Sequence, residues 1–385
     1  MGKRELLLVA AFIVLGTVVY QVTATPVDPS RPGWSFSGMV QQLRRHLGGN
    51  QATAKTATST TAPAPSSLRE MRIVMRSGAI TVTGEDRTDI QIDLKVSSTG
   101  FDAAEAEQLA KATTVKVDEA GPLLIATVDY PEAGRQTASL EVRVPKRLVI
   151  RMDEKNGVLT VNDVAGVVIG AGRGESNIAN IAGLVQVTQR GSVISVSDVD
   201  TLRLTTRSGA EARVVRVRGD ASFTLQGGEL RAEAIVGAIE VDGQNTDVRF
   251  EKLEKTGRPL RINVNNGEVV LAGVQTETRI DGRDTDIRVD QPVAALLSIY
   301  NDGDEAIEFT APANGFNLDA ITAEGRLTID SGLEKAGVSV SEGTKAAGDG
   351  SRAARNESRA SAAVRGGGPT ITIRATRGDI TIRSR

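Results

Sequence analysis

Residues 156–183 read NGVLTVNDVAGVVIGAGRGESNIANIAG and contain two copies of the short pattern that decides the fold. Each copy is a Gly followed by apolar residues at fixed offsets and by a second Gly: Gly157, Leu159, Val161, Val164 and Gly166 in the first, Gly174, Ile178, Ile181 and Gly183 in the second. Imperfect copies then start at Gly191, Gly209, Gly228, Thr246, Gly267, Thr285, Gly303 and Gly325. The chain from Gly157 to Gly332 therefore repeats itself in steps of 17 to 22 residues.

The alternation of apolar and polar residues within each copy predicts short strands with one buried face. A Gly ahead of each strand supplies the positive φ that a tight corner needs. One such unit cannot bury its own inner face, so the copies must stack. The pattern predicts a mainly β fold, a parallel β-solenoid (single-stranded β-helix) of about ten coils, roughly 50 Å long at about 4.8 Å between strands.

A β-sandwich with evenly spaced hairpins is the alternative architecture. Hairpins would favour two-residue turns and antiparallel neighbours, whereas the near-constant offsets after each Gly favour a repeating corner. The interior positions are mostly small aliphatic residues, which fit a narrow solenoid and agree with an aromatic content of only 3%. The solenoid is the preferred interpretation.

Composition excludes several kinds of chemistry. The formal net charge of the 385 residues is −2, which does not indicate a nucleic-acid partner. The chain has no Cys, so neither a disulfide framework nor thiol chemistry is available. The single His, His46, has no second His with which to share a metal ion, and a solvated helix residue is the preferred interpretation.

Residues 1–24 predict a transmembrane helix. Lys3 and Arg4 precede an apolar segment, from Leu6 to about Ala24, which is either a cleaved signal peptide or an uncleaved signal anchor. We favour the single-pass anchor. Because the positive charges lie on its amino side, the N-terminus would be cytoplasmic and the C-terminal domain extracytoplasmic, in the periplasm or at the cell surface.

Residues 25–67 are expected to join this helix to the folded domain. Residues 34–47 place apolar side chains at helical spacing opposite basic ones, which predicts an amphipathic helix at the membrane surface. Packing of that helix on the protein itself is an equal alternative. Residues 48–67 are rich in Ala, Thr and Pro, which predicts a flexible linker.

The remaining chain divides into four parts. Residues 68–146 predict N-terminal strands and a helix over 102–112, with Asp102 as its N-cap, that caps the solenoid and hides its first sheet edge. Residues 147–332 are the solenoid repeats. Residues 333–368, poor in apolar side chains, predict a disordered loop, and residues 369–385 predict strands that form the last coil.

Several stretches carry a family resemblance. The series RSGAITVTGEDRTDIQIDLKV, the Ala- and Glu-rich helix after it, and LEVRVPKRLVIRMDEKNGVLTVNDVAG resemble the bacterial putative-adhesin family with β-strand repeats, as does the closing RGDITIRSR. The resemblance covers about residues 69–332 and 369–385. It implies an exported β-helical domain, often tethered to a membrane, with no established enzyme activity and no catalytic residues to transfer.

One cluster of carboxylates could be catalytic. Asp281, Asp284 and Asp286 alternate with Arg279, Arg283 and Arg288. Asp284 and Asp286 stand two residues apart, so they would share a strand face and could serve as general acid and base on a glycan. The preferred interpretation is an ordinary ion-paired strand surface.

A second acidic stretch, Asn301–Glu305, could bind Ca²⁺. It lacks the spacing of an EF-hand loop, and a polar turn is the preferred interpretation. We therefore assign no catalytic, cofactor-binding or metal-binding residue.

Three function classes fit these observations. The first is a membrane-tethered, non-catalytic structural or interaction module, adhesin-like, whose partner is an envelope protein or a surface polymer. The second is a cell-envelope sensor or regulator that acts through a membrane partner protein. The third is a β-helix carbohydrate-active enzyme, which the scarce aromatic residues and missing metal ligands disfavour. We expect the first, and no enzyme activity.

Overall fold

The computed structural model describes residues 52–385 apart from 133–134, 254–257 and 346–354. The predicted transmembrane helix over residues 1–24, the predicted amphipathic helix and His46 lie outside the described residues. Among the residues that are described, no helix has the length and apolar character needed to cross a membrane.

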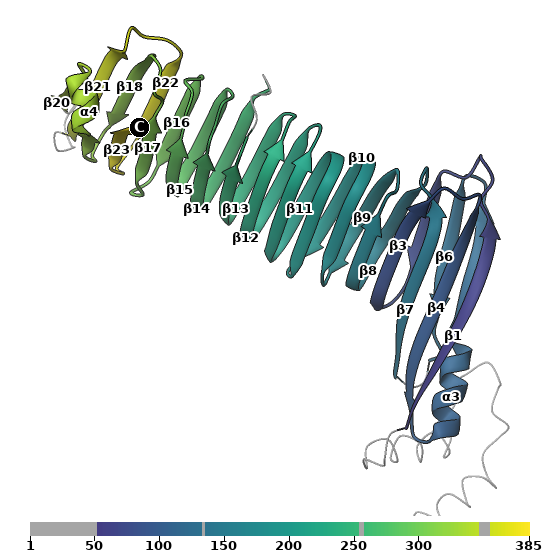
Figure 1. Ribbon diagram of the computed structural model, residues 1–385. Coiled ribbons are helices and arrows are strands. Elements are labelled where there is room, and N and C mark those ends of the chain that lie inside the picture. Colours follow the sequence, from purple (N-terminus) through teal and green to yellow (C-terminus); the bar gives the residue numbers. More distant parts are fainter. Residues whose placement is uncertain (1–51, 133–134, 254–257, 346–354) are drawn as a thin grey trace, which may run out of the picture.

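The chain winds into a long stack of coils, each with two strand segments joined at a bend (Figure 1). Strand β12 (Ala221–Ile235) shows the plan. Its first half pairs in parallel with residues 239–244 of β13 (Ile239–Glu251), and its second half pairs with residues 246–251 of the same strand. The first halves of all coils form one surface, called face A here, and the second halves form face B. This parallel pairing confirms the predicted solenoid and excludes the sandwich.

The central coils follow one another in chain order. They comprise β8 (Val149–Asn162), β9 (Gly166–Arg173), β10 (Ser176–Arg190), β11 (Val193–Val217), β12, β13, β14 (Leu260–Ala272), β15 (Thr278–Asp290), β16 (Leu297–Asp302) and β17 (Ile307–Ala311). The apolar residues that define the repeat, such as Leu159, Val161 and Ile178, are at most 1% exposed. Inside the stack the rings of Phe223 and Phe250 meet edge to face, with centroids 6.2 Å apart.

The bends depend on residues with positive φ. Gly228 has a φ of 87°, and a Cβ added there would lie 2.1 Å from the carbonyl oxygen of Ala210 on the neighbouring coil. Gly209 has a φ of 74° at the preceding bend, but no atom lies within 4 Å of its Cβ position. The repeat therefore needs positive φ at both bends, and absence of a side chain only at Gly228.

One polar cluster lies inside the stack near its N-terminal end. The buried Lys155 amine donates hydrogen bonds to the carbonyl oxygens of Gly174 (3.0 Å) and Glu175 (2.7 Å) and to Oγ of Ser176 (2.8 Å). Burial disfavours its charged form and lowers its pKa to about 8. The side chain thus ties two successive coils together from within.

At the N-terminal end the coils are out of chain order. Strands β2 (Glu70–Val74) and β3 (Gly78–Glu85) pair in parallel with β8 on one side. On the other side they pair with β6 (Leu123–Asp129) and β7 (Arg135–Pro145). The first coil of the chain is therefore inserted between the second and the third.

Antiparallel strands complete this end. Strand β5 (Thr114–Ala120) continues face A beside β6, and β4 (Asp89–Gly100) continues face B beside β7. Strand β1 (Ala52–Pro63) then pairs with β4 along its whole length. The prediction of a flexible linker over residues 48–67 is therefore wrong for 52–63. Alanine and threonine there complete a sheet edge, where a strand needs backbone pairing more than bulky side chains.

The predicted helix is present as α3 (Ala103–Ala112), and the Asp102 side chain accepts a hydrogen bond from the amide of Glu105 at 2.8 Å. Its position differs from the prediction. The helix packs against β1 and β4 through Ala106, Leu109 and Ala110, at the far end of these strands (Figure 1). The end of face B is covered by β4 and β1, so the helix does not cap the stack.

The C-terminal end repeats the insertion. Strands β22 (Thr370–Ala375) and β23 (Ile380–Ser384) lie between the coil of β16 and β17 and the coil of β18 (Phe316–Thr322) and β19 (Leu327–Ile329). The closing strands thus form the coil before the last, which corrects the prediction for residues 369–385. Backbone pairing on both sides buries Ile371 and Ile382 completely, which an end position would not do.

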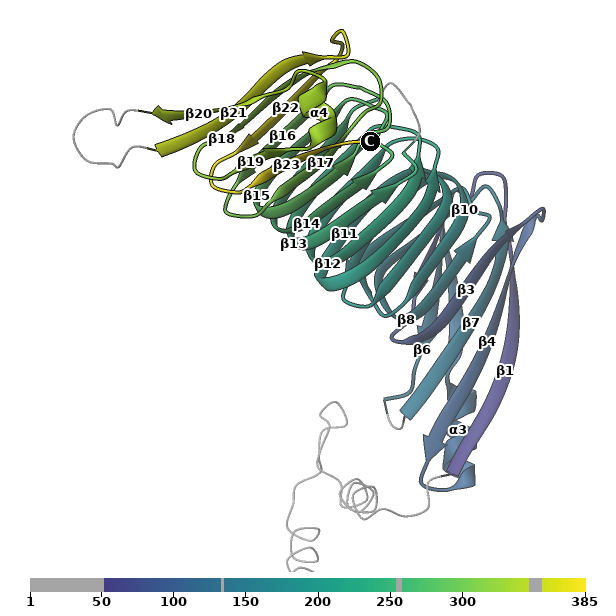
Figure 2. The same cartoon turned by 60° about the vertical axis from the view of Figure 1, so that its left-hand side comes forward.

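Residues 333–368 are not the predicted disordered loop where the structure describes them. They include the end of α4 (Ser331–Lys335) and strands β20 (Val340–Lys345) and β21 (Arg355–Val364). Strand β21 pairs antiparallel with β18, and β20 pairs with β21, so face A is extended beyond the last coil (Figure 2). Ala360 and Val364 are buried there, so few apolar residues suffice to hold this strand.

Candidate functional site

An open groove of about 830 Å³ lies on face A, over β12 to β16 and β22. Its side chains are mainly amides, carboxylates, guanidinium groups and hydroxyls. They include Thr224, Gln226, Asp242, Gln244, Asn263, Asn265, Arg279, Asp281, Arg283, Ser298, Tyr300, Asp302 and Arg374. The groove is therefore polar, with the interior of the solenoid beneath it.

Parallel register arranges these side chains in rows along the stack. Gln226 pairs with Gln244, and Gln244 with Asn265, so three amides stand at the same position of three successive coils. Neighbouring strands are about 4.8 Å apart, which sets the spacing within such a row. Among the described residues, none of these three side chains has a hydrogen-bond partner. Their donors and acceptors are thus available to a ligand.

The charges of the groove balance. Asp242, Asp281 and Asp302 face Arg279, Arg283 and Arg374, which gives a net charge of −3 + 3 = 0. Arg279 makes two bonds to Asp281, at 2.7 and 3.1 Å, and this pairing raises the pKa of its guanidinium. Such a surface neither attracts nor repels a charged polymer strongly.

One aromatic ring lies over the groove. Tyr300 pairs with Asp281 on one side and with Arg374 on the other, and it is 46% exposed. Its neighbour Arg374 is held by an ion pair with Asp319. A half-exposed ring beside the amide row offers both a flat apolar surface and a hydroxyl group to a ligand.

The predicted carboxylate cluster is not assembled. Strand β15 turns at Asp284, which has a φ of 47°, so Asp281 lies on face A and Asp286 on face B. Asp286 accepts a hydrogen bond from the backbone amide of Ala306 at 3.3 Å. Arg288 also lies on face B, where it pairs with Glu268 at 2.7 Å. The prediction that Asp284 and Asp286 share a strand face is wrong, because Asp284 is a bend residue. The two carboxylates therefore do not form a catalytic pair.

The acidic stretch Asn301–Glu305 forms the next bend. Asn301 is buried and donates to the carbonyl oxygens of Thr285 (2.9 Å) and Glu305 (3.1 Å). Asp304 pairs with Arg377. In the part of the chain that the structure describes, no group of three His, Cys, Asp or Glu residues could hold a metal ion. The stretch is thus built as a polar bend.

Sequence reasoning missed the amide row. The three residues occupy one position of the repeat, two residues before Gly228, Thr246 and Gly267, and this spacing was visible in the sequence. The apolar pattern of the repeat marks its buried positions, whereas the groove depends on the exposed ones.

Stacked parallel coils with a bend in each define this chain as a two-faced parallel β-solenoid protein. The chain belongs to the family described as Toastrack DUF4097, whose model matches residues 68–383. This match confirms the resemblance described above, to a family whose function is unknown. No curated protein matches the chain.

Solved structures that are similar to the chain include the following three. They are a putative adhesin from Parabacteroides merdae ATCC 43184 (10% identity, 88% of this chain and 98% of that chain covered, TM-score 0.33), a putative adhesin from Parabacteroides distasonis ATCC 8503 (10%, 86% and 97%, 0.31) and a putative cell adhesion protein from Clostridium sporogenes ATCC 15579 (9%, 87% and 100%, 0.21). Likeness at these TM-scores carries no functional argument.

Proposed function

We propose that this protein is a non-catalytic interaction module, held at the cell membrane by residues 1–24, whose groove on face A binds an uncharged, hydroxyl-rich polymer such as a neutral surface glycan. The observation that carries the proposal is the row of Gln226, Gln244 and Asn265. Side-chain amides offer donors and acceptors together, which suits hydroxyl groups that also do both. A row with one amide per coil suits a ligand that is itself a repeating chain.

Charge balance supports an uncharged ligand. A polyanion would require unpaired basic side chains, whereas Arg279 is paired with Asp281 and Arg374 with Asp319. Binding of a neutral glycan should therefore change little with salt, because screening acts on charges.

The arrangement of carboxylates supports a binding function over catalysis. Asp281 is bonded to Arg279, and Asp242 accepts a hydrogen bond from Asn263 at 3.3 Å. A glycosidase needs one free carboxylate on each side of the scissile bond. The described groove offers no such pair.

The test is binding of the full-length protein, in lipid nanodiscs, to neutral and to anionic polysaccharides. For the neutral ligand we expect Gln244→Ala with Asn265→Ala to raise Kd about tenfold, since each lost hydrogen bond costs about 0.5–1.5 kcal/mol. Gln186→Ala, an exposed amide on face A outside the groove, is the matched control and should leave Kd unchanged. Binding restricted to polyanions, or an unchanged Kd in the double variant, would contradict the proposal.

Tyr300 gives a second readout. Tyr300→Ala should weaken binding up to about tenfold, because a stacked ring contributes about 0.5–1.5 kcal/mol, whereas Tyr300→Phe should retain most of the affinity. Equal losses in both variants would show that the ring is not a stacking surface.

A further inference from the structure

The stack has four terminal strands, and they differ in how they are protected. Face A ends in β5 and in β20, and face B ends in β1 and in β19. A terminal strand exposes unpaired backbone groups, and proteins usually protect it by charge, by shortness or by a covering element. Comparison of the four ends within one molecule shows which of them lacks such protection.

Three ends are protected. Strand β5 carries Lys116, Asp118 and Glu119 among its seven residues. Strand β19 has three residues, and α4 follows it directly. Strand β20 has only six residues, and the exposed Glu342 places a charge on it. Each of these ends therefore disfavours the addition of another strand.

Strand β1 is neither short nor rich in charge. It has 12 residues, pairs with β4 at every position from Ala52 to Pro63 without a bulge, and contains one charged residue, Lys55. Within the described part of the chain β4 is its only strand partner, so its second edge is open. It is the longest of the four terminal strands, and it carries only one charge in its 12 residues.

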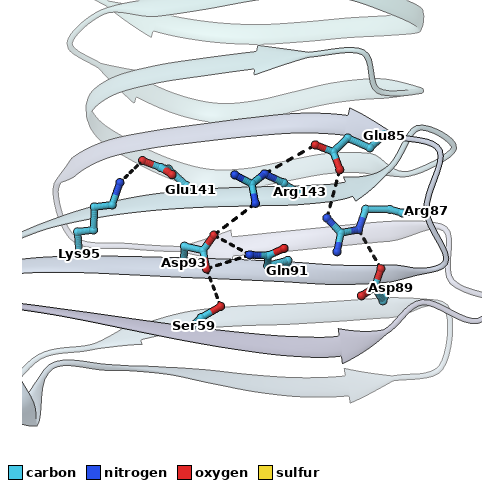
Figure 3. A network of polar contacts seen from close by, with 9 residues as sticks. All are labelled: Ser59, Glu85, Arg87, Asp89, Gln91, Asp93, Lys95, Glu141 and Arg143. Atoms are coloured by element: carbon cyan, nitrogen blue, oxygen red, sulfur yellow. Dashed lines mark hydrogen bonds and ion pairs between the residues drawn. The ribbon is translucent and has the colours of Figure 1, made fainter.

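The ion pairs of this region stop one strand short of the edge. Figure 3 shows ion pairs between β4 and β7, such as Lys95 with Glu141 at 2.5 Å and Arg143 with Asp93 at 3.8 Å. The network reaches β1 only through Ser59, which donates to Asp93 at 2.6 Å and helps to lower the pKa of that carboxyl. The network fixes the register of β1 through Ser59 and adds no charged side chain to this strand, whose one charge is Lys55.

We propose that β1 is an interface between two copies of this chain, in which two β1 strands pair antiparallel about a two-fold axis at Thr58. A long edge with one charge in 12 residues suits a partner strand of equally low charge, and β1 itself is one. In this register Lys55 lies opposite Thr61, so the two lysines stay apart, and Thr56 lies opposite Thr60. Paired threonines stabilise neighbouring antiparallel strands.

The position of α3 also favours antiparallel pairing. The helix begins at Ala103, three residues after Gly100, and Gly100 lies opposite Ala52, so α3 covers the Ala52 end of the strand pair. In the antiparallel arrangement the two helices lie at opposite ends of the interface and do not collide. The interface lies on face B and leaves the groove on face A accessible in both copies.

The absence of cysteine makes the interface directly testable. Thr58→Cys places the only thiol of each full-length chain on the proposed axis, where facing Cβ atoms are about 5 Å apart and within reach of a disulfide after a small adjustment. Under mild oxidation in nanodiscs we expect most of this variant to migrate as a covalent dimer. Glu119→Cys on β5 is the matched control and should remain monomeric.

Two further variants make the result decisive. Thr58→Lys places two like charges on the axis and should raise the dimer dissociation constant at least tenfold with an unchanged circular dichroism spectrum. Thr53→Cys lies opposite Pro63 in the proposed register and should not form a disulfide. Efficient crosslinking of Thr53→Cys would indicate parallel pairing and overturn the proposal. Monomeric wild-type protein at tens of micromolar, by light scattering, would overturn it as well.

Discussion

The carboxylate of Asp330 accepts hydrogen bonds from both the backbone amide and the hydroxyl of Ser384, at 2.6 and 2.5 Å. Its other oxygen accepts from the amide of Leu333 at 3.0 Å, as the N-cap of α4. One side chain therefore fastens the helix after the last coil to the strand inserted before that coil. Burial raises the pKa of Asp330, but the hydrogen bonds from Ser384 and Leu333 outweigh it and leave the pKa lowered.

Asp330→Ala should lower the free energy of unfolding by about 2–3 kcal/mol, since it removes a helix cap and two further hydrogen bonds. A carboxyl with a lowered pKa stabilises the fold above its unfolded pKa of about 3.8, and that contribution is lost as the pH falls through the folded value. The difference between wild type and Asp330→Ala should therefore shrink below about pH 4. Hydrogen exchange at Ile380 and Ile382 measures it, and an equal difference at all pH values would contradict the pKa argument.

The two bend glycines offer a matched pair. Gly209→Ala should cost only the strain of positive φ, about 1–2 kcal/mol, because its Cβ has free space. Gly228→Ala should cost at least twice as much, because its Cβ would lie 2.1 Å from the Ala210 carbonyl oxygen and the coils would have to separate. Urea unfolding of both variants checks the difference. Equal midpoints would mean that the bend relaxes without cost.

The buried amine of Lys155 predicts how the stability of the protein changes at alkaline pH. Lys155 keeps its proton in the unfolded chain up to about pH 10.5 but loses it near pH 8 when folded. Between these values the unfolded state binds more protons, so wild-type stability should rise with pH. In Lys155→Met this rise should vanish, whereas Lys252→Met, at an exposed position, should retain it. Thermal unfolding from pH 7 to 10.5 provides the measurement.

The aromatic pair inside the stack can be tested by a double-mutant cycle. Phe223→Ala should cost about 3–5 kcal/mol through the cavity it leaves. Phe223→Leu, Phe250→Leu and the double variant should show a coupling of about 0.5–1.5 kcal/mol, as expected for rings that meet edge to face. Additive single effects would show that the two rings are energetically independent.

The middle of the fold could be predicted from the sequence because its interactions are local and repeated. The offsets after Gly157 and Gly174 follow from one strand, one bend and the next strand, so a short window contains the whole rule. The start of α3 could likewise be predicted, because Asp102 is a residue type that favours the N-cap position.

The ends could not be predicted because they depend on pairing between distant segments. Residues 52–63 have the composition of a linker and become a strand only because β4 offers them an edge. The local sequence does not specify that residues 370–384 lie before the coil of residues 316–329 in the stack. The isoleucines of 370–384 would also be partly buried if this segment formed the last coil. The groove was missed for a related reason, since it combines exposed residues from six strands.

The insertion at the C-terminal end has a consequence for the order of events during synthesis. The coil of residues 316–329 leaves the ribosome before its inner neighbour, residues 370–384, exists. It cannot dock permanently on residues 297–311, because that position belongs to the later segment. The coils can thus form one after another up to Ala311, but the C-terminal end can assemble only after residues 370–384 have been synthesised. A prematurely terminated chain would retain an open, adhesive end that quality-control proteases could recognise.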